Sequence, residues 1–220
     1  MKTIYNFTRL LAIVCCVVCF GSAAQAQNKT AKTWLDKSST AFTAAGTWSA
    51  DFSMTIKMAT QKTARSFDGT IDVKGAKYHL NVPEMELWFD SKTQWVLQKD
   101  FQEVNVSEPG AQEAQQLNPA FLFTLYQKDC SYSYLGEKTE NGRKVHEVEL
   151  IPQSKKSDLT KVVLQISATD AMPTKMHLFY RNNTENIILI NKYRKNLSLP
   201  DSFFSFDPQK YPKVDVIDLR

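Results

Sequence analysis

The chain has 220 residues, of which 43% are hydrophobic and 23% are charged, and its formal net charge is +4. That charge is too small for the basic surface that nucleic-acid binding requires, so we expect no nucleic-acid partner. The length suits one domain with a substantial hydrophobic core.

The first 26 residues have the pattern of a cleaved signal peptide. Lys2 and Arg9 form a basic start, and the apolar run over residues 10–20 is too short to span a bilayer. Ala24-Gln25-Ala26 is a typical cleavage site. We therefore expect residues 27–220 to form the mature chain as a single domain.

The cysteines favour a soluble exported protein over a lipid-anchored one. A lipid-anchored precursor needs small residues just before its acceptor cysteine, and Cys15, Cys16 and Cys19 lack them. Once the leader is removed, Cys130 is the only cysteine and has no partner within the chain. We expect Cys130 to be a small buried strand residue.

The period of the apolar residues predicts an amphipathic helix from Thr33 to Ala45. Gly46 is well placed to end it. Core packing and a part in binding account equally well for its apolar face. That face holds Trp34, Leu35, Ser38, Ala41, Phe42 and Ala45.

The period changes to two from Trp48 to Met58, which predicts a long antiparallel strand with one apolar and one solvated side. Its two methionines suit an adaptable binding surface, although ordinary core filling would give the same pattern. The apolar side consists of Trp48, Ala50, Phe52, Met54, Ile56 and Met58.

Five more short strands follow before residue 107, joined by tight turns, which predicts sequential antiparallel pairing. Pro83 interrupts the alternation once. The apolar residues of these strands are Phe67, Ile71, Val73, Tyr78, Leu80, Val82, Met85, Leu87, Phe89, Trp95, Leu97, Val104 and Val106.

The stretch from Asn118 to Gln127 carries no charge and is apolar on nearly every side. Asn118 can cap a helix, and Pro119 suits the first helical position. A helix this short is not stable alone, so we expect it to be buried or to cover something apolar. We expect it to form a lid together with the first helix. In that lid Phe121, Leu122 and Leu125 would lie against Trp34, Leu35 and Phe42.

Strands resume after this helix, and Asn141-Gly142 marks a hairpin turn. About eleven strands and two or three helices, without an internal linker, predict a mainly β, α+β fold. We expect a strongly curved antiparallel sheet that forms an unclosed barrel, with the helices covering one opening.

No catalytic or metal-binding pattern is found. His79, His146 and His177 each stand alone on a strand, on its polar face or near its end, without a second ligand at metal-binding spacing. The sequence has no nucleophile elbow, no phosphate-binding loop and no dinucleotide turn. We therefore expect no enzyme and no cofactor, which leaves binding.

The order of five segments resembles the periplasmic outer-membrane lipoprotein carrier family, LolA. The first segment resembles the family's F-S-A-x-F opening strand, and the last resembles its closing F-x-F-x-P…V-D-V-I-D. The segments are Trp48-Ser49-Ala50-Asp51-Phe52, Phe67 to Lys74, Phe89 to Trp95, Asn118 to Leu125, and Phe204 to Asp218.

The resemblance implies a periplasmic carrier whose apolar cavity takes the acyl chains of lipoproteins from the inner to the outer membrane. The implied partners are acylated lipoproteins and an inner-membrane lipoprotein-releasing transporter. Whether an outer-membrane receptor takes part is left open. We expect a monomer. The candidate lipid-binding residues are Trp34, Leu35, Phe42, Phe121, Leu122 and Leu125 in the lid, and Trp48, Phe52, Met54, Ile56, Phe67, Ile71, Tyr78, Leu80, Leu87 and Phe89 inside the sheet.

Two points remain open. The same scaffold could serve as a periplasmic sensor or interaction domain whose cavity is filled by its own side chains or by another lipid. In addition, the family often has an arginine after its second strand that bonds the lid shut, whereas this chain has Lys74-Gly75-Ala76-Lys77 there. Lysine lacks the forked geometry of arginine, so we expect apolar contact to hold the lid.

Overall fold

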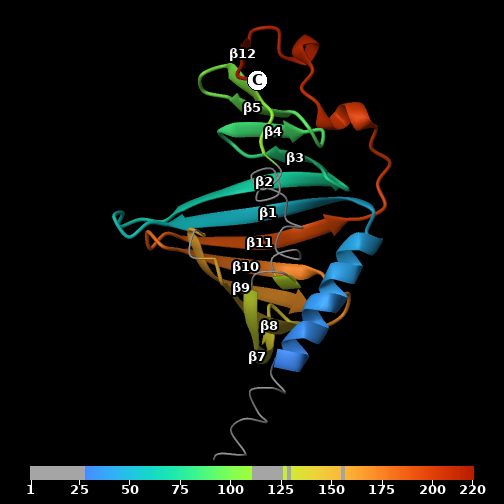
Figure 1. Ribbon diagram of the computed structural model, residues 1–220, viewed down its shortest axis with the longest axis vertical. Coiled ribbons are helices and arrows are strands. Elements are labelled where there is room, and N and C mark those ends of the chain that lie inside the picture. Colours follow the sequence, from blue (N-terminus) through green and yellow to red (C-terminus); the bar gives the residue numbers. More distant parts are fainter. Residues whose placement is uncertain (1–27, 111–125, 128–129, 155–156) are drawn as a thin grey trace, which may run out of the picture.

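Twelve strands form one open sheet in a computed structural model that describes residues 28–110, 126–127, 130–154 and 157–220. The strand order is β12-β6-β5-β4-β3-β2-β1-β11-β10-β9-β8-β7. Neighbouring strands are antiparallel, except that β12 runs parallel to β6. β12 and β7 form the two free edges, so the predicted unclosed barrel is confirmed, with one strand more than expected (Figure 1).

The helix and strand bounds agree closely with the sequence pattern. The first helix covers residues 28–44, so it begins earlier than predicted. The strands are β1 Thr47–Lys57, β2 Arg65–Lys74, β3 Lys77–Asn81, β4 Met85–Phe89, β5 Gln94–Gln98, β6 Glu103–Ser107, β7 Cys130–Glu140, β8 Arg143–Pro152, β9 Leu159–Ser167, β10 Pro173–Tyr180, β11 Glu185–Arg194 and β12 Asp215–Asp218, and two short 3-10 helices are η1 Asp201–Phe204 and η2 Pro208–Lys210.

β1 is the central strand of the sheet. It pairs with β2 on one side and with β11 on the other, and so joins the β1–β6 meander to the β7–β11 meander. Apolar side chains on one face of both meanders form the main core together with the helix. We call this face the inner side and the opposite face the outer side.

Most apolar residues of β5 and β6 face the outer side, which the alternation along the chain did not reveal, whereas Val96 packs against the main core. Leu97 lies opposite Glu86 on β4 and opposite Val104 on β6, so the three share one face. Leu97 and Val104 form a second cluster with Trp88 and Phe206, apart from the main core. β4 is therefore buried on both sides.

A strap made of residues 200–214 covers this outer cluster (Figure 1). Phe206 and Tyr211 contact the ring of Trp88 edge-on, with centroids 5.5 and 5.6 Å away. Asp201 at the start of the strap pairs with Lys74 and Lys77, each at 2.8 Å. These lysines occupy the turn at which the resembling family often has an arginine, and both form ion pairs with Asp201 of the strap.

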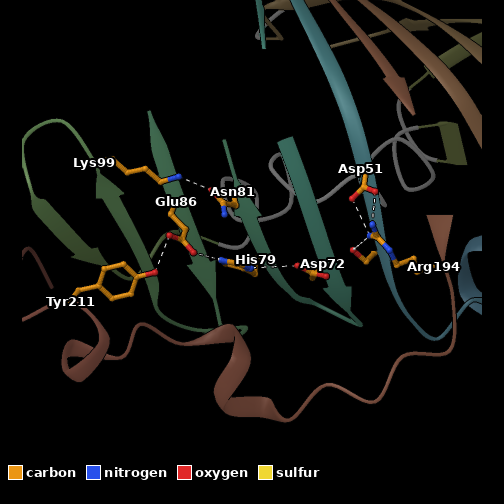
Figure 2. Close-up of polar contacts among 9 residues, drawn as sticks. Asp51, Asp72, His79, Asn81, Glu86, Lys99, Arg194 and Tyr211 are labelled. Carbon is orange, nitrogen blue, oxygen red and sulfur yellow. Dashed lines mark hydrogen bonds and ion pairs between the residues drawn. The ribbon is translucent and has the colours of Figure 1, made fainter. Parts of the chain in front are cut away.

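His79 on β3 is buried beneath the strap in a polar network (Figure 2). Its Nε2 lies 2.8 Å from Glu86 Oε1 and its Nδ1 lies 3.4 Å from Asp72 Oδ2. The Tyr211 hydroxyl donates to the other oxygen of Glu86 at 2.9 Å. Burial alone would lower the pKa of His79, but the hydrogen bonds to the two carboxylates outweigh it and raise that pKa above 6.5.

We expect the stabilisation by His79 to fade as the pH rises. A histidine with a raised pKa in the folded state stabilises fully below its unfolded pKa, and it loses this contribution as the pH passes its folded pKa. Urea unfolding of the wild type and of His79→Gln, from about pH 6 to about pH 9, measures the effect. The difference in unfolding free energy between the wild type and His79→Gln should shrink with rising pH. A difference that grows with pH would contradict a raised pKa of His79.

Candidate functional site

The inner side forms an apolar wall, and it is the candidate binding site. Its rows come from alternate residues of β1, β2 and β8–β11, which the period of two places on one face. Along β1 the inner residues Trp48, Ala50 and Phe52 are fully buried, whereas Met54 and Ile56 are half-buried. The wall is thus closed at the helix and more open at the other end of the strands.

The helix closes the first end by crossing the strand ends from β1 towards β8 (Figure 1). Phe42 meets Trp48 edge-on, with centroids 4.9 Å apart, and Tyr193 contacts both rings. The hydroxyl of Tyr193 donates to the Pro173 carbonyl at 3.0 Å. This aromatic cluster fixes one end of the helix to the centre of the sheet.

Trp34 holds the other end of the helix against β8. Its ring stacks on His146 with centroids 3.6 Å apart, and the Lys37 ammonium lies 4.3 Å from the Trp34 centroid. Tyr134 Oη lies 2.9 Å from His146 Nδ1. Burial lowers the pKa of His146 below 6.5, which favours a neutral ring. His146 is therefore a partnered strand histidine that lies under the helix.

The open end of the wall is apolar and half-exposed. Met54 lies opposite Phe67 on β2 and opposite Ile188 on β11, and Ile188 lies opposite Met176 on β10. Leu178 lies beside them on β10 and also packs against the main core. We use the term open end for Met54, Ile56, Phe67, Leu178 and Ile188.

The predicted site residues are of three kinds: buried, half-buried, or outside the part of the chain that the structure describes. Ile56 is half-buried and lies outside the main core cluster. Phe121, Leu122 and Leu125 lie outside the described residues, so their lid contacts stay predictions. The buried members of the core are Leu35, Phe42, Trp48, Phe52, Ile71, Tyr78, Leu87 and Phe89, and Trp34, Met54, Phe67 and Leu80 pack against it half-buried.

The sequence reasoning left out the half of the wall that β8–β11 provide. These strands alternate as clearly as β1 does, so the same signal would have identified their inner residues. The residues missed are Val148, Leu150, Val162, Leu164, Ile166, Met176, Leu178, Ile188 and Ile190.

A hollow of about 530 Å³ lies on the other side of the helix, between its polar residues and Ala171. Asp36 and Lys37 contribute to its lining. Ala41 and Ala171 in its lining also pack against the main core, so the hollow borders the wall, and its charged side chains make it less suited to an acyl chain.

Gly69 on β2 leaves the space that the Phe52 ring occupies in the wall. A Cβ on Gly69 would lie 2.6 Å from Phe52 Cζ and 2.8 Å from Val82 Cγ1, closer than atoms pack. Both neighbours contribute to the main core, so a methyl group here would displace core side chains.

We expect Gly69→Ala to lower the free energy of unfolding by about 1–3 kcal/mol, because it overpacks the wall. Urea denaturation measures this loss. Gly110→Ala is the matched control, since a Cβ there would meet nothing within 4 Å. The control should change stability by less than about 0.5 kcal/mol, and equal effects of the two substitutions would argue against overpacking.

A polar contact joins the helix to the far end of the predicted lid segment. Tyr126 is buried, and its hydroxyl donates to Asp36 Oδ1 at 2.8 Å. The other carboxylate oxygen of Asp36 accepts from Lys32 at 2.6 Å. A hydrogen bond thus supplements the apolar contacts that we expected to hold the lid.

Tyr126→Phe should weaken this attachment by about 1 kcal/mol, the usual net value of one hydrogen bond. A double-mutant cycle with Asp36→Ala, followed by thermal unfolding, isolates the pair from the Lys32 contact. Coupling close to zero would show that the bond contributes nothing in solution.

No helix of the described residues is long and apolar enough to cross a membrane. Nor do these residues contain a group of three or more histidine, cysteine or acidic side chains that could hold a metal ion. The lone Cys130 is half-buried, and burial raises the pKa of its thiol to about 11.

Solved structures with the same fold come from distant bacteria. An uncharacterized conserved protein from Thermus thermophilus has 9% identity and a TM-score of 0.58, over 86% of this chain and 99% of that chain. LprF from Mycobacterium bovis has 13% identity and a TM-score of 0.50, over 78% and 96%. A DUF1329 family protein from Desulfovibrio piger has 10% identity and a TM-score of 0.50, over 81% and 97%. These likenesses show the fold alone.

A comparison with curated proteins finds no match. Residues 21–181 match the family of the outer membrane lipoprotein carrier protein LolA, which covers well over half of the chain. The match includes the helix and the strands from β1 to β10, which form most of the inner wall. The chain therefore belongs to the outer membrane lipoprotein carrier protein LolA family.

Proposed function

We propose that this chain is a periplasmic carrier that binds the acyl chains of lipoproteins against its inner wall and takes them from the inner to the outer membrane. The observation that carries the proposal is the apolar open end, whose residues are only half-buried and continue the buried wall under the helix. Monomeric soluble proteins seldom expose contiguous apolar surface unless it binds something. Membership of the LolA family supports the same conclusion.

The energetics favour a wall that is only partly closed when empty. Each buried CH₂ group contributes ~0.8 kcal/mol, so one long acyl chain gains roughly 10 kcal/mol on full burial. A carrier must also release its cargo. Moving the helix away from Phe42, Trp48 and Tyr193 would break the aromatic cluster and offset part of that gain.

The proposed setting follows from the leader and the family. Cleavage after residue 26 would leave the mature chain in the periplasm. An inner-membrane transporter that releases lipoproteins would load it there. We propose that it works as a monomer, because one copy of the sheet contains both halves of the wall.

A second candidate function is a sensor or interaction domain with a self-filled cavity. The closed end favours it, since Val148, Leu150, Val162, Leu164 and Ile166 are fully buried or nearly so. Native mass spectrometry of protein purified from membranes separates the two functions. A carrier should retain co-purified lipid, and a self-filled domain should carry none.

Two neighbouring residues of β11 give a direct test of the wall. Ile188 faces the open end and Leu189 faces the outer side, where it is 37% exposed. We expect Ile188→Glu to reduce binding of an acylated peptide by at least about 100-fold, because a charge would have to be buried beside the acyl chain. Fluorescence titration with a labelled lipopeptide measures this.

Leu189→Glu is the matched control, since it adds the same charge to the same strand on the solvated side. It should bind as the wild type does, and circular dichroism should show both variants folded. Unchanged binding by a folded Ile188→Glu variant would place the acyl chains elsewhere.

A further inference from the structure

Two buried polar atoms have no hydrogen-bond partner in the part of the chain that the structure describes. One is Ser38 Oγ, in the middle of the helix face that packs on the sheet. The other is Asn186 Oδ1, near the start of β11. A buried acceptor without a donor is costly to keep, so each such atom calls for a physical reason.

Asn186 lies at the open end of the inner wall. In the sheet it stands opposite Ile56 on β1 and opposite Leu178 on β10. Ile188, the next residue of β11 on the same face, packs against the main core. The Asn186 carboxamide is thus a polar group set among apolar side chains at the entrance to the wall.

The Asn186 side chain forms a hydrogen bond with the Tyr180 side chain. The Asn186 Oδ1 atom has no hydrogen-bond partner among the described residues. Other polar groups on the inner side have found partners. The Tyr193 hydroxyl donates to the Pro173 carbonyl, and Tyr134 contacts His146. Asn191, on the same strand but on the outer side, donates to Ser53 Oγ at 2.9 Å. Ser38 Oγ lies on the helix at the closed end, so Asn186 Oδ1 is the unpaired buried acceptor that the described residues place at the open end.

We propose that Asn186 Oδ1 accepts a hydrogen bond from an N–H or O–H group at the head of an acyl chain lodged against the inner wall. This assignment rests on the proposed carrier function and adds to it a preference for one chemical class of cargo. The cargo favoured is an acyl chain attached to a donor, such as an N-acyl amide, over one whose polar junction offers acceptors alone. Asn186 lies beyond residue 181, where the family match ends.

The dimensions of the wall agree with this placement. Asn186 and Tyr193 are seven residues apart on β11, which is roughly 23 Å of strand. One leaflet of a bilayer's hydrocarbon core is ~15 Å thick, so an acyl chain with its head at Asn186 fits before the aromatic cluster at Tyr193. The protein part of a lipoprotein would then remain outside the open end.

The test compares two probes, of which only one has an N–H donor at the head of the acyl chain, and the Asn186→Leu variant corrects for the size and shape of the added methyl group. One is a short peptide with an N-palmitoyl amide, and the other is the same peptide methylated at that amide nitrogen. We expect the wild type to bind the N–H probe about 10-fold more tightly, the usual effect of leaving a buried acceptor unpaired. In Asn186→Leu the ratio of the two affinities should fall to about 1.

Asn191→Leu, on the outer side of the same strand, is the matched control and should keep the wild-type ratio. Because the readout is a ratio within each protein, a general loss of stability in a variant does not imitate it. Equal binding of both probes by the wild type would overturn the role of Asn186 and leave the carrier function standing. Failure of the wild type to bind either probe would overturn both.

Discussion

The pairing of β1 with β11 is the contact on which the rest of the structure depends. It joins two meanders that would otherwise be separate small sheets, each with one side of its apolar face unsupported. The Arg194 guanidinium reinforces it with two hydrogen bonds to the Asp51 carboxylate across the strand pair, on the outer side (Figure 2). The inner wall is continuous only because this seam holds.

The two sides of the sheet have different tasks. Under the helix the inner side is apolar and buried, and it becomes half-buried towards the open end. The outer side of β3–β6 is fixed by the strap through Asp201, the His79 network and the rings around Trp88. The outer side of β3–β6 is thus fixed independently of the inner core.

The alternation in β1 and β2 was enough to predict the wall, because a period of two determines which residues share a face. β4 shows where this reasoning stops. Leu87, Trp88 and Phe89 are all buried, since the outer side is covered by Phe206, which is more than a hundred residues away in sequence. No local pattern predicts that contact. Nor could the sequence distinguish the inward Asn186 from an ordinary turn residue.

The sequence separation across the central seam also bears on how the chain reaches its destination. Ser49 and Arg194 meet in neighbouring strands although they are 145 positions apart in the sequence. Long-range strand pairing makes folding slow, because loop closure must precede any stabilising contact. Until β11 has been synthesised and has paired with β1, the central seam is missing and the sheet is incomplete. Slow completion of this seam is compatible with the export proposed for the chain, because a chain that has not finished folding can still pass through a channel.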